Sequence, residues 1–395
     1  MTPSTRKSHY MLSITNKSNK PRLAYVINVD WYFRLHWLNR AKAALTSGYQ
    51  VYIITAFVTP GVKREFEIHG FDCIHIRLSR TGINPVQEIK SAIQLYRILK
   101  QIQPDIVHSI TVKPNIYAGI AANLLRVPSI KSIPGLGVTF SNHGIFYRLI
   151  RKLILVLYKP AGAGNHGAFV FENMADKTVF YKNGLGRKQE MIHIPGAGID
   201  ASLFRFAPKP FPDRLKILFA ARLLKEKGLD TLVSAVEAAN TRGCPCDLLV
   251  AGIFDPAAKA AYSQREIHAL ASSGKIQWLG QVNDMPALLD QVDIVALPTR
   301  YGEGIPRILI EAGAVGRLVI TTAIPGCSQL LKNNINGILV QPNDADGICK
   351  VLCNIMKHPH RYEKMSATFY KEILNRYTDK DIIPQFLGLY SRFCR

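Results

Sequence analysis

The sequence predicts an α/β protein with two doubly wound parallel sheets that face a central cleft. Short apolar runs rich in Val and Ile alternate with longer stretches whose apolar residues have helical spacing. This alternation restarts after a proline-rich segment near the middle of the 395-residue chain. Strands that alternate with helices form parallel sheets covered on both faces, and a chain of this length can bury two such cores.

The first half of the chain contains six apolar runs that indicate buried strands. These are Leu23–Val29, Val51–Phe57, Cys73–Ile76, Ile106–Ile110, Ser129–Ile133 and Ala168–Phe171. Between them, Trp37–Ser47 and Val86–Gln101 carry apolar residues at helical spacing, so we expect helices there.

Pro208–Pro212 interrupts the pattern, because its prolines cannot continue a helix or a central strand. Six more predicted strands follow: Lys216–Ala220, Leu248–Ala251, Lys275–Leu279, Asp293–Leu297, Leu318–Thr321 and Gly337–Val340. We therefore divide the chain into a basic tail (1–21), a first domain (22–207), a linker (208–213), a second domain (214–376) and a terminal segment (377–395). Ligands of such sheets bind beyond the carboxyl ends of the strands, so functional residues are expected just after strands.

Positive charge is concentrated in the first half of the chain. Residues 1–164 carry a net charge of +16 and residues 165–395 a net charge of +6, which together make the total of +22. The first half is therefore expected to meet an anionic partner: nucleic acid, an anionic membrane surface or a phosphorylated substrate. A nucleic-acid-binding protein would need basic residues interleaved with exposed aromatics or a recognisable module. The sequence has neither, so no specific nucleic-acid partner is expected.

The cysteines and the amino terminus suggest a protein of the cytoplasm. The cysteine number is odd, at seven, and the only close pair, Cys244 and Cys246, lacks the two-residue spacer of redox or zinc pairs. We expect reduced thiols and neither a disulfide framework nor a zinc site. The first twenty residues contain no apolar run, so no signal peptide is expected, and no apolar stretch reaches the roughly 20 residues that cross a bilayer.

The segment Phe219–Asp230 runs from the end of a predicted strand into a helix. It places Arg222 and Lys227 near a helix N-terminus, where free amides and the helix dipole favour an anion. Arg222 can grip two phosphate oxygens at once, whereas Lys227 acts as a point charge. A solvated basic loop is the alternative.

Two carboxylates follow the predicted strand Asp293–Leu297. Glu311 lies in an apolar stretch of a predicted helix, and Pro306 is suited to the first turn of that helix. A buried carboxylate needs hydrogen-bond donors, which the two hydroxyls of a ribose could supply. Glu303 lies in a glycine-flanked turn, where it could meet the hydroxyls of a sugar beside the amides of Gly304 and Ile305. Two unrelated surface acids are the alternative.

Glu303 and Glu311, with seven residues between them and the loop of Arg222 and Lys227 before them, resemble a known pattern. It is that of the retaining, nucleotide-sugar-dependent glycosyltransferases with the GT-B fold, two Rossmann-like domains around a cleft. Ile194–Asp200 is similar to the hinge-proximal glycine motif of that family, and Ile324–Val340 to its usual continuation after the second carboxylate. Tyr377–Tyr390 resembles its terminal helix, which crosses back to the first domain. Val29–Phe33 with His36 resembles the subgroup that builds bacterial polysaccharides such as O-antigen and capsule on lipid carriers.

The resemblance implies a set of roles. Arg222 and Lys227 would hold the donor pyrophosphate and neutralise the leaving group, Glu311 would bind the ribose and Glu303 would position the donor sugar. The implied donor is a nucleotide sugar such as a UDP-sugar, the transferred group is a hexose or N-acetylhexosamine, and the acceptor is a lipid-pyrophosphate-linked glycan. Neither a metal nor a cofactor is implied. Acceptor contacts are expected from three residues of the first domain: Asp30, His36 and Lys113.

The chain departs from many relatives at Ile133–Gly137, where they carry a His after the strand, so no catalytic His can be assigned there. His108, in an apolar strand, is expected to be a core residue. Asp344 and Asp346 have the spacing of a metal-binding acidic pair, but their position after a strand favours capping of the next helix.

The segment Phe146–Lys159 contains no acid and predicts a basic amphipathic helix of the kind that lies in a membrane interface. The alternative is an ordinary helix packed on the first sheet with its charges reaching solvent. We expect a protein on the inner face of the cytoplasmic membrane. A soluble enzyme that acts on a small-molecule acceptor is the second possibility.

Overall fold

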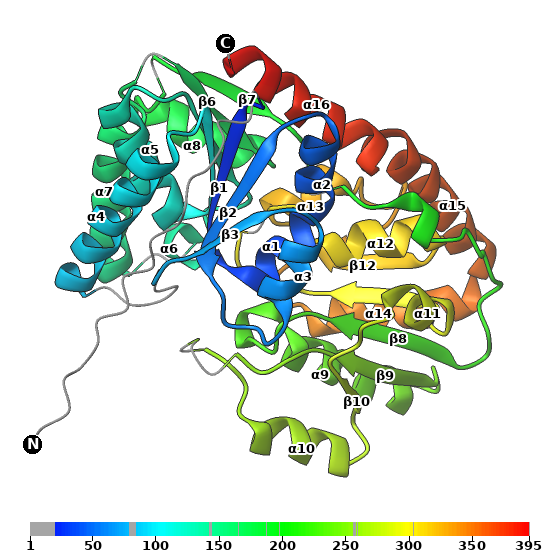
Figure 1. Ribbon diagram of the computed structural model, residues 1–395. Coiled ribbons are helices and arrows are strands. Elements are labelled where there is room, and N and C mark those ends of the chain that lie inside the picture. The colour runs from blue at the N-terminus through cyan, green and yellow to red at the C-terminus, as the bar shows by residue number, and fades with distance from the viewer. Residues whose placement is uncertain are drawn as a thin grey trace, which may run out of the picture.

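In the computed structural model of the protein, the described residues are 20–78, 84–141, 144–164, 166–186, 188–196, 198–255, 258, 260–302 and 304–394. They form two parallel sheets, each with helices on both faces, and the terminal helix runs across both halves (Figure 1). The predicted fold class is confirmed.

The first sheet has seven parallel strands in the order β3-β2-β1-β4-β5-β6-β7. Their bounds are β1 (Arg22–Val29), β2 (Gln50–Ala56), β3 (Asp72–His75), β4 (Ile106–Ile110), β5 (Ser129–Ile133), β6 (Gly167–Phe171) and β7 (Glu190–His193). The six predicted strands all form, within one residue of their expected bounds. Strand β7 was missed because it is a short edge strand without a fully buried residue, and so it has no apolar run.

Eight helices are described in the first domain. They are α1 (Asp30–His36), α2 (Leu38–Thr46), α3 (Val62–Ile68), α4 (Pro85–Ile102), α5 (Val112–Leu125), α6 (Val138–Ser141), α7 (Ile145–Ala161) and α8 (Met174–Lys182). The start of α4 illustrates the local causes. Asn84 accepts hydrogen bonds from the amides of Val86 and Gln87, and Pro85 occupies the first turn, where its missing N–H costs nothing.

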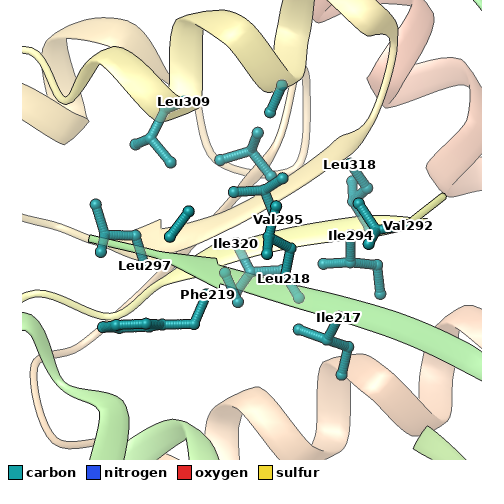
Figure 2. Packing of buried hydrophobic residues seen from close by; sticks show 14 of the residues in the cluster. Ile217, Leu218, Phe219, Val292, Ile294, Val295, Leu297, Leu309, Leu318 and Ile320 are labelled. Atoms are coloured by element: carbon teal, nitrogen blue, oxygen red, sulfur yellow. The ribbon is translucent and has the colours of Figure 1, made fainter. Parts of the chain in front are cut away.

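The second sheet has six parallel strands in the order β10-β9-β8-β11-β12-β13. The strands are β8 (Leu215–Ala220), β9 (Cys246–Ala251), β10 (Gln277–Gly280), β11 (Ile294–Leu297), β12 (Leu318–Thr322) and β13 (Ile338–Val340). The helices of this half are α9 (Leu229–Thr241), α10 (Gln264–Ser272), α11 (Met285–Asp290), α12 (Arg307–Val315), α13 (Pro325–Leu330), α14 (Ala345–Lys357) and α15 (Pro359–Arg376). Figure 2 shows the core between β8, β11, β12 and α12, built from Ile217, Phe219, Val295, Leu309 and Ile320 among others.

The terminal helix α16 (Asp379–Phe393) packs against α2 of the first domain (Figure 1). Its Tyr390 hydroxyl lies 2.8 Å from the Tyr25 hydroxyl and 2.7 Å from Nδ1 of His108, all inside the first core. His108 Nε2 is 2.8 Å from the Ser132 hydroxyl, so both ring nitrogens have partners. The expectation that His108 is a core residue is confirmed.

One expectation about the cysteines is wrong. The structure joins Cys244 and Cys353 in a disulfide, with their Cα atoms 5.4 Å apart, whereas we expected only free thiols. The two residues are 109 positions apart in the chain. Their pairing depends on the packing of α14 beside α9, which spacing in the sequence cannot reveal.

Two further expectations concern metals and membranes. Asp344 caps α14, because its Oδ1 accepts a hydrogen bond of 2.8 Å from the Gly347 amide, and Asp346 forms ion pairs with Arg242 and Lys350. No group of three His, Cys, Asp or Glu side chains suited to a metal occurs among the described residues. In that same part of the chain, no helix combines the length and apolar character that crossing a bilayer requires.

Candidate functional site

Arg222 and Lys227 lie where the carboxyl end of β8 turns into α9. The turn is a short 3₁₀ helix, Lys225–Lys227, followed by Gly228 with a φ of +81°. A Cβ atom at Gly228 would lie 2.0 Å from the Pro298 carbonyl oxygen, so only glycine fits this approach. The N-cap residue Gly228 has no side chain to cap α9, and the Asp230 amide of the first turn bonds to the Tyr262 hydroxyl.

Arg222 is held from two sides. Its Nη1 donates a hydrogen bond of 2.9 Å to Oδ2 of Asp255, which is buried after β9. Its guanidinium carbon lies 6.0 Å from the centre of the Trp31 ring, which belongs to the first domain. The Arg222 side chain remains 34% exposed, so part of its donor fork can still reach a ligand in the cleft.

Lys227 is buried, and its Nζ lies 5.1 Å from the centre of the Tyr301 ring. Tyr301 belongs to the loop that follows β11, the strand paired with β8. The two predicted cations therefore lie at the same sheet edge as the predicted carboxylate loop. Parallel pairing of β8 and β11 brings these segments together, as expected for functional residues placed after strands.

Glu311 is buried in α12, and Oε1 of its carboxylate lies 2.6 Å from Nε of Arg307. Burial raises the pKa of Glu311, and Arg307 opposes this rise. A ribose at this carboxylate would share it with Arg307. Arg307 also donates through Nη1 to the Leu35 carbonyl oxygen, so it joins the second domain to α1 of the first.

Glu303 lies outside the described residues, but its neighbours are well defined. Gly304 approaches the first domain so closely that a Cβ atom there would lie 1.5 Å from the Pro134 carbonyl oxygen. Ile305 is buried beside it. Gly304 is thus in contact with Pro134, which directly follows β5.

Of the three predicted acceptor residues, Asp30 and Lys113 have partners within the first domain. The buried Asp30 carboxylate accepts hydrogen bonds from the amides of Val58 and Thr59, at 3.0 and 2.8 Å, and thereby anchors the loop after β2. Lys113 forms an ion pair of 2.6 Å with Glu88 of α4. These contacts give both residues a structural role.

His36 lies within range of the charges of Arg222 and Lys227. Its ring centre is 4.4 Å from that of Tyr32. Burial, together with the charges of Arg307, Arg40 and Arg222, holds the pKa of His36 well below its usual value. The imidazole is therefore neutral at pH 7 and can accept or donate one hydrogen bond at the cleft.

Sequence reasoning missed two acidic residues of this region, Asp255 and Glu172. Asp255 lies in the loop after β9, and Glu172 directly follows β6. The position of each just after a parallel strand was the available signal. That signal is weak, because many residues follow strands and no motif distinguishes these two. Only the fold brings Asp255 to Arg222 and Glu172 to Ile305.

Two Rossmann-like parallel sheets, each covered by helices on both faces, define the GT-B architecture. HepE of Anabaena in complex with UDP has this fold, with a TM-score of 0.73, 17% sequence identity, and coverage of 94% of this chain and 100% of that one. The family model "Glycosyl transferase 4-like" matches residues 22–160, and "Glycosyl transferases group 1" matches residues 200–372. The chain belongs to these glycosyltransferases.

Two relatives are bacterial enzymes. The N,N'-diacetylbacillosaminyl-diphospho-undecaprenol alpha-1,3-N-acetylgalactosaminyltransferase of Campylobacter jejuni is 26% identical over 339 residues, which cover 82% of this chain and 86% of that protein. The UDP-Gal:alpha-D-GlcNAc-diphosphoundecaprenol alpha-1,3-galactosyltransferase of Escherichia coli is 26% identical over 288 residues, 69% of this chain and 72% of that protein. Both names describe sugar transfer to a lipid-diphosphate-linked sugar.

Proposed function

We propose that this protein is a retaining, metal-independent glycosyltransferase that moves a hexose or N-acetylhexosamine from a UDP-sugar to a lipid-pyrophosphate-linked glycan. The acceptor would be an intermediate of bacterial surface polysaccharide, such as O-antigen or capsule, at the inner face of the cytoplasmic membrane. The observation that supports the donor half is the placement of Arg222 and Lys227 in the turn that leads into the N-terminus of α9. The activities for which the two relatives are named support the acceptor half of the proposal.

The chemistry follows from these positions. As the bond between sugar and phosphate breaks, negative charge grows on the departing diphosphate, and Arg222, Lys227 and the positive end of the α9 dipole would stabilise it. Glu311 would hold the ribose and Glu303 the donor sugar. The departing phosphate itself would take the proton of the acceptor hydroxyl on the same face of the sugar, which gives retention without a side-chain base.

The first domain offers a surface suited to a lipid-linked acceptor. Helices α4, α5 and α7 pack side by side on the outer face of the first sheet (Figure 1). The outer surface of α7 is apolar, with Phe146, Leu149 and Leu153 each more than half exposed, and Arg148 and Lys152 are exposed beside them. Only the last turns of α7 are buried, through Tyr158 and Ala161.

Exposed apolar residues beside basic ones fit the boundary of an anionic bilayer, where each basic residue contributes about 1 kcal/mol. Helix α4 adds three exposed apolar residues on the same side of the domain: Val86, Ile89 and Ile93. We therefore place the membrane contact of the enzyme on α7 and α4, and the acceptor lipid beside them.

Donor binding is the first test. UDP, GDP and ADP would be compared by thermal shift with wild-type protein and with Arg222→Ala. A ligand present at 100 times its dissociation constant stabilises the folded state by about 2.7 kcal/mol. We expect a shift with UDP that is lost in the variant. A shift with GDP or ADP instead would correct the nucleotide, and no shift with any of the three would contradict the donor site.

Transfer is the second test. UDP-Gal and UDP-GalNAc would be incubated with GlcNAc-diphosphoundecaprenol in detergent micelles, with and without EDTA, and the anomeric configuration of the product would be read by NMR. We expect an α-linked product and no loss of rate with EDTA. Transfer to free N-acetylglucosamine at an equal rate would favour the soluble enzyme with a small-molecule acceptor. An inverted product or a rate abolished by EDTA would contradict the proposed mechanism.

A further inference from the structure

The turn after β6 is a contact point between the two domains. Gln329, from α13 of the second domain, donates through Nε2 to the Glu172 carbonyl oxygen at 3.1 Å and accepts through Oε1 from the Met174 amide at 2.9 Å. Its Nε2 also lies 2.6 Å from Nε2 of His193 at the end of β7. One side chain of the second domain therefore holds the main chain on both sides of Asn173.

The side chain of Glu172 reaches the second domain at a different place. The Ile305 amide donates a hydrogen bond to its carboxyl group. Its Oε2 lies 2.6 Å from where a Cβ atom of Gly304 would stand, and the Pro134 carbonyl oxygen approaches the same glycine from β5's side of the cleft. The first domain thus meets Gly304 and Ile305 with one carbonyl oxygen and one carboxyl group.

We propose that Glu172 is a positioning residue of the transfer reaction, which holds the Gly304–Ile305 segment against the first domain so that donor and acceptor sites meet in one geometry. This inference rests on the proposed function of that segment in binding the donor sugar. The Ile305 amide lies outside any helix or strand and so has no partner from regular secondary structure. The carboxyl group of Glu172, from the other domain, satisfies it. Gln329 holds the Glu172 main chain through its carbonyl oxygen, so the Glu172 side chain has a fixed position against which Gly304 and Ile305 pack.

The electrostatic surroundings decide the charge of this carboxyl group. Burial raises the pKa of Glu172 to about 8; Arg40 of α2 and the Ile305 amide oppose the rise, and Asp176 of α8 adds to it. Tyr32 of α1 faces the carboxyl group as well, and His193 lies beside the Glu172 carbonyl. At neutral pH Glu172 is therefore mostly protonated and uncharged, and its carbonyl oxygen accepts from the amide.

An ionised Glu172 would add one more negative charge beside the segment proposed to hold the donor sugar, so it would disfavour an anionic donor relative to the neutral carboxyl group. Bound donor favours the protonated form, so by linkage the donor binds more weakly as the pH rises through about 8. Glutamine has the same shape and hydrogen-bonding oxygen but does not titrate. Glu172→Gln is consequently a matched variant that keeps the contact and removes the charge change.

The experiment compares wild type, Glu172→Gln and Glu172→Ala in the transfer assay with UDP-Gal or UDP-GalNAc and in titrations with UDP. Because UDP is held by the second domain, we expect its dissociation constant to stay within about twofold in both variants at pH 7. We expect Glu172→Ala to lower kcat by roughly tenfold to a hundredfold, the cost of a misplaced reacting group. Glu172→Gln should keep most of kcat at pH 7 and should lose the rise in KM for the donor above pH 8.

Several results would overturn the inference. One is a wild-type kcat in Glu172→Ala, and another is an alkaline rise in donor KM that persists unchanged in Glu172→Gln. If Glu172→Ala does not fold, the pH profile of Glu172→Gln still decides the question. Failure of the proposed function has a separate signature, because wild-type protein would then neither bind UDP nor transfer the sugar.

Discussion

Arg222 depends on residues from distant segments of the chain for its position. Asp255 fixes one edge of its guanidinium after β9, and Trp31 of the first domain lies near its face. The interaction with Asp255 leaves enough of the side chain exposed to meet a phosphate, and an arginine held in place loses less entropy on binding its ligand.

Replacing Arg222 by alanine should lower kcat for transfer by about a hundredfold to a thousandfold, as removal of a donor to developing negative charge does in other enzymes. The initial rate of UDP release in the transfer assay measures it. Arg214→Ala is the control, since Arg214 forms an exposed pair of 2.9 Å with Asp247 in the same domain. Near wild-type turnover in Arg222→Ala would contradict the assigned role.

Glu311→Gln tests the ribose contact. The variant removes a charged acceptor, whose hydrogen bonds contribute about 1.5–3 kcal/mol, so UDP affinity should fall roughly tenfold or more. Isothermal titration with UDP measures this, with Glu237→Gln as control because Glu237 forms an exposed pair with Lys275. Unchanged UDP affinity in Glu311→Gln would show that the ribose is bound elsewhere.

At the scale of elements, α7 has features of both helices considered for the segment Phe146–Lys159: an ordinary helix packed on the domain and an amphipathic helix with an exposed apolar side. Its final turns pack against the domain, as an ordinary helix would, through Tyr158. The preceding turns present Leu149 and Leu153 to solvent. A contiguous exposed apolar surface of this kind is characteristic of a region that contacts a protein or a membrane.

Arg148→Glu combined with Lys152→Glu should weaken binding to vesicles that contain anionic lipid. At about 1 kcal/mol for each charge lost, the partition coefficient should fall at least tenfold, and added salt should reduce the difference. Co-sedimentation with phosphatidylglycerol vesicles measures it. Lys364→Glu with Lys371→Glu, on exposed positions of α15, makes the same charge change and should have a small effect. Equal losses in both double variants would indicate net charge rather than α7.

At the scale of the molecule, α16 links the end of the chain to the first domain. At its start, Tyr377 before the helix and Asp379 within it form backbone hydrogen bonds with Ile199. Its far end buries Tyr390 beside Tyr25 and His108. The contacts at Gln329, Arg307 and Ile305 lie nearer the cleft. Together they set how the two sheets face one another.

Tyr390→Phe should destabilise the protein by about 1–3 kcal/mol, because it leaves the buried Tyr25 hydroxyl and His108 Nδ1 without their shared partner. Urea unfolding followed by circular dichroism measures the change in the free energy of unfolding. Tyr181→Phe is the control, since that side chain is 76% exposed. Equal stability of the two variants would contradict a structural role for the hydroxyl pair.

Local pattern was enough to predict the fold class, twelve of the thirteen strands in the described part of the chain, and the placement of Arg222 and Lys227 between β8 and α9. Buried parallel strands have continuous apolar runs, and functional residues follow them directly, so both signals are local in the chain. Strand β7 lacked such a run. The cap at Asp344 was predicted because capping depends on a few neighbouring residues.

Contacts between distant segments were decided only by the tertiary structure. Three such contacts join residues whose spacing in the sequence gives no sign of them. They are the disulfide between Cys244 and Cys353, the hydrogen bond from Arg222 to Asp255, and the hydrogen bond from the Ile305 amide to Glu172. Asp30 and Lys113 each follow a strand, and folding places Thr59 beside the first and Glu88 beside the second, partners that their positions in the sequence do not reveal. The chemistry of each residue is local, but its partner is set by how the sheets and helices pack.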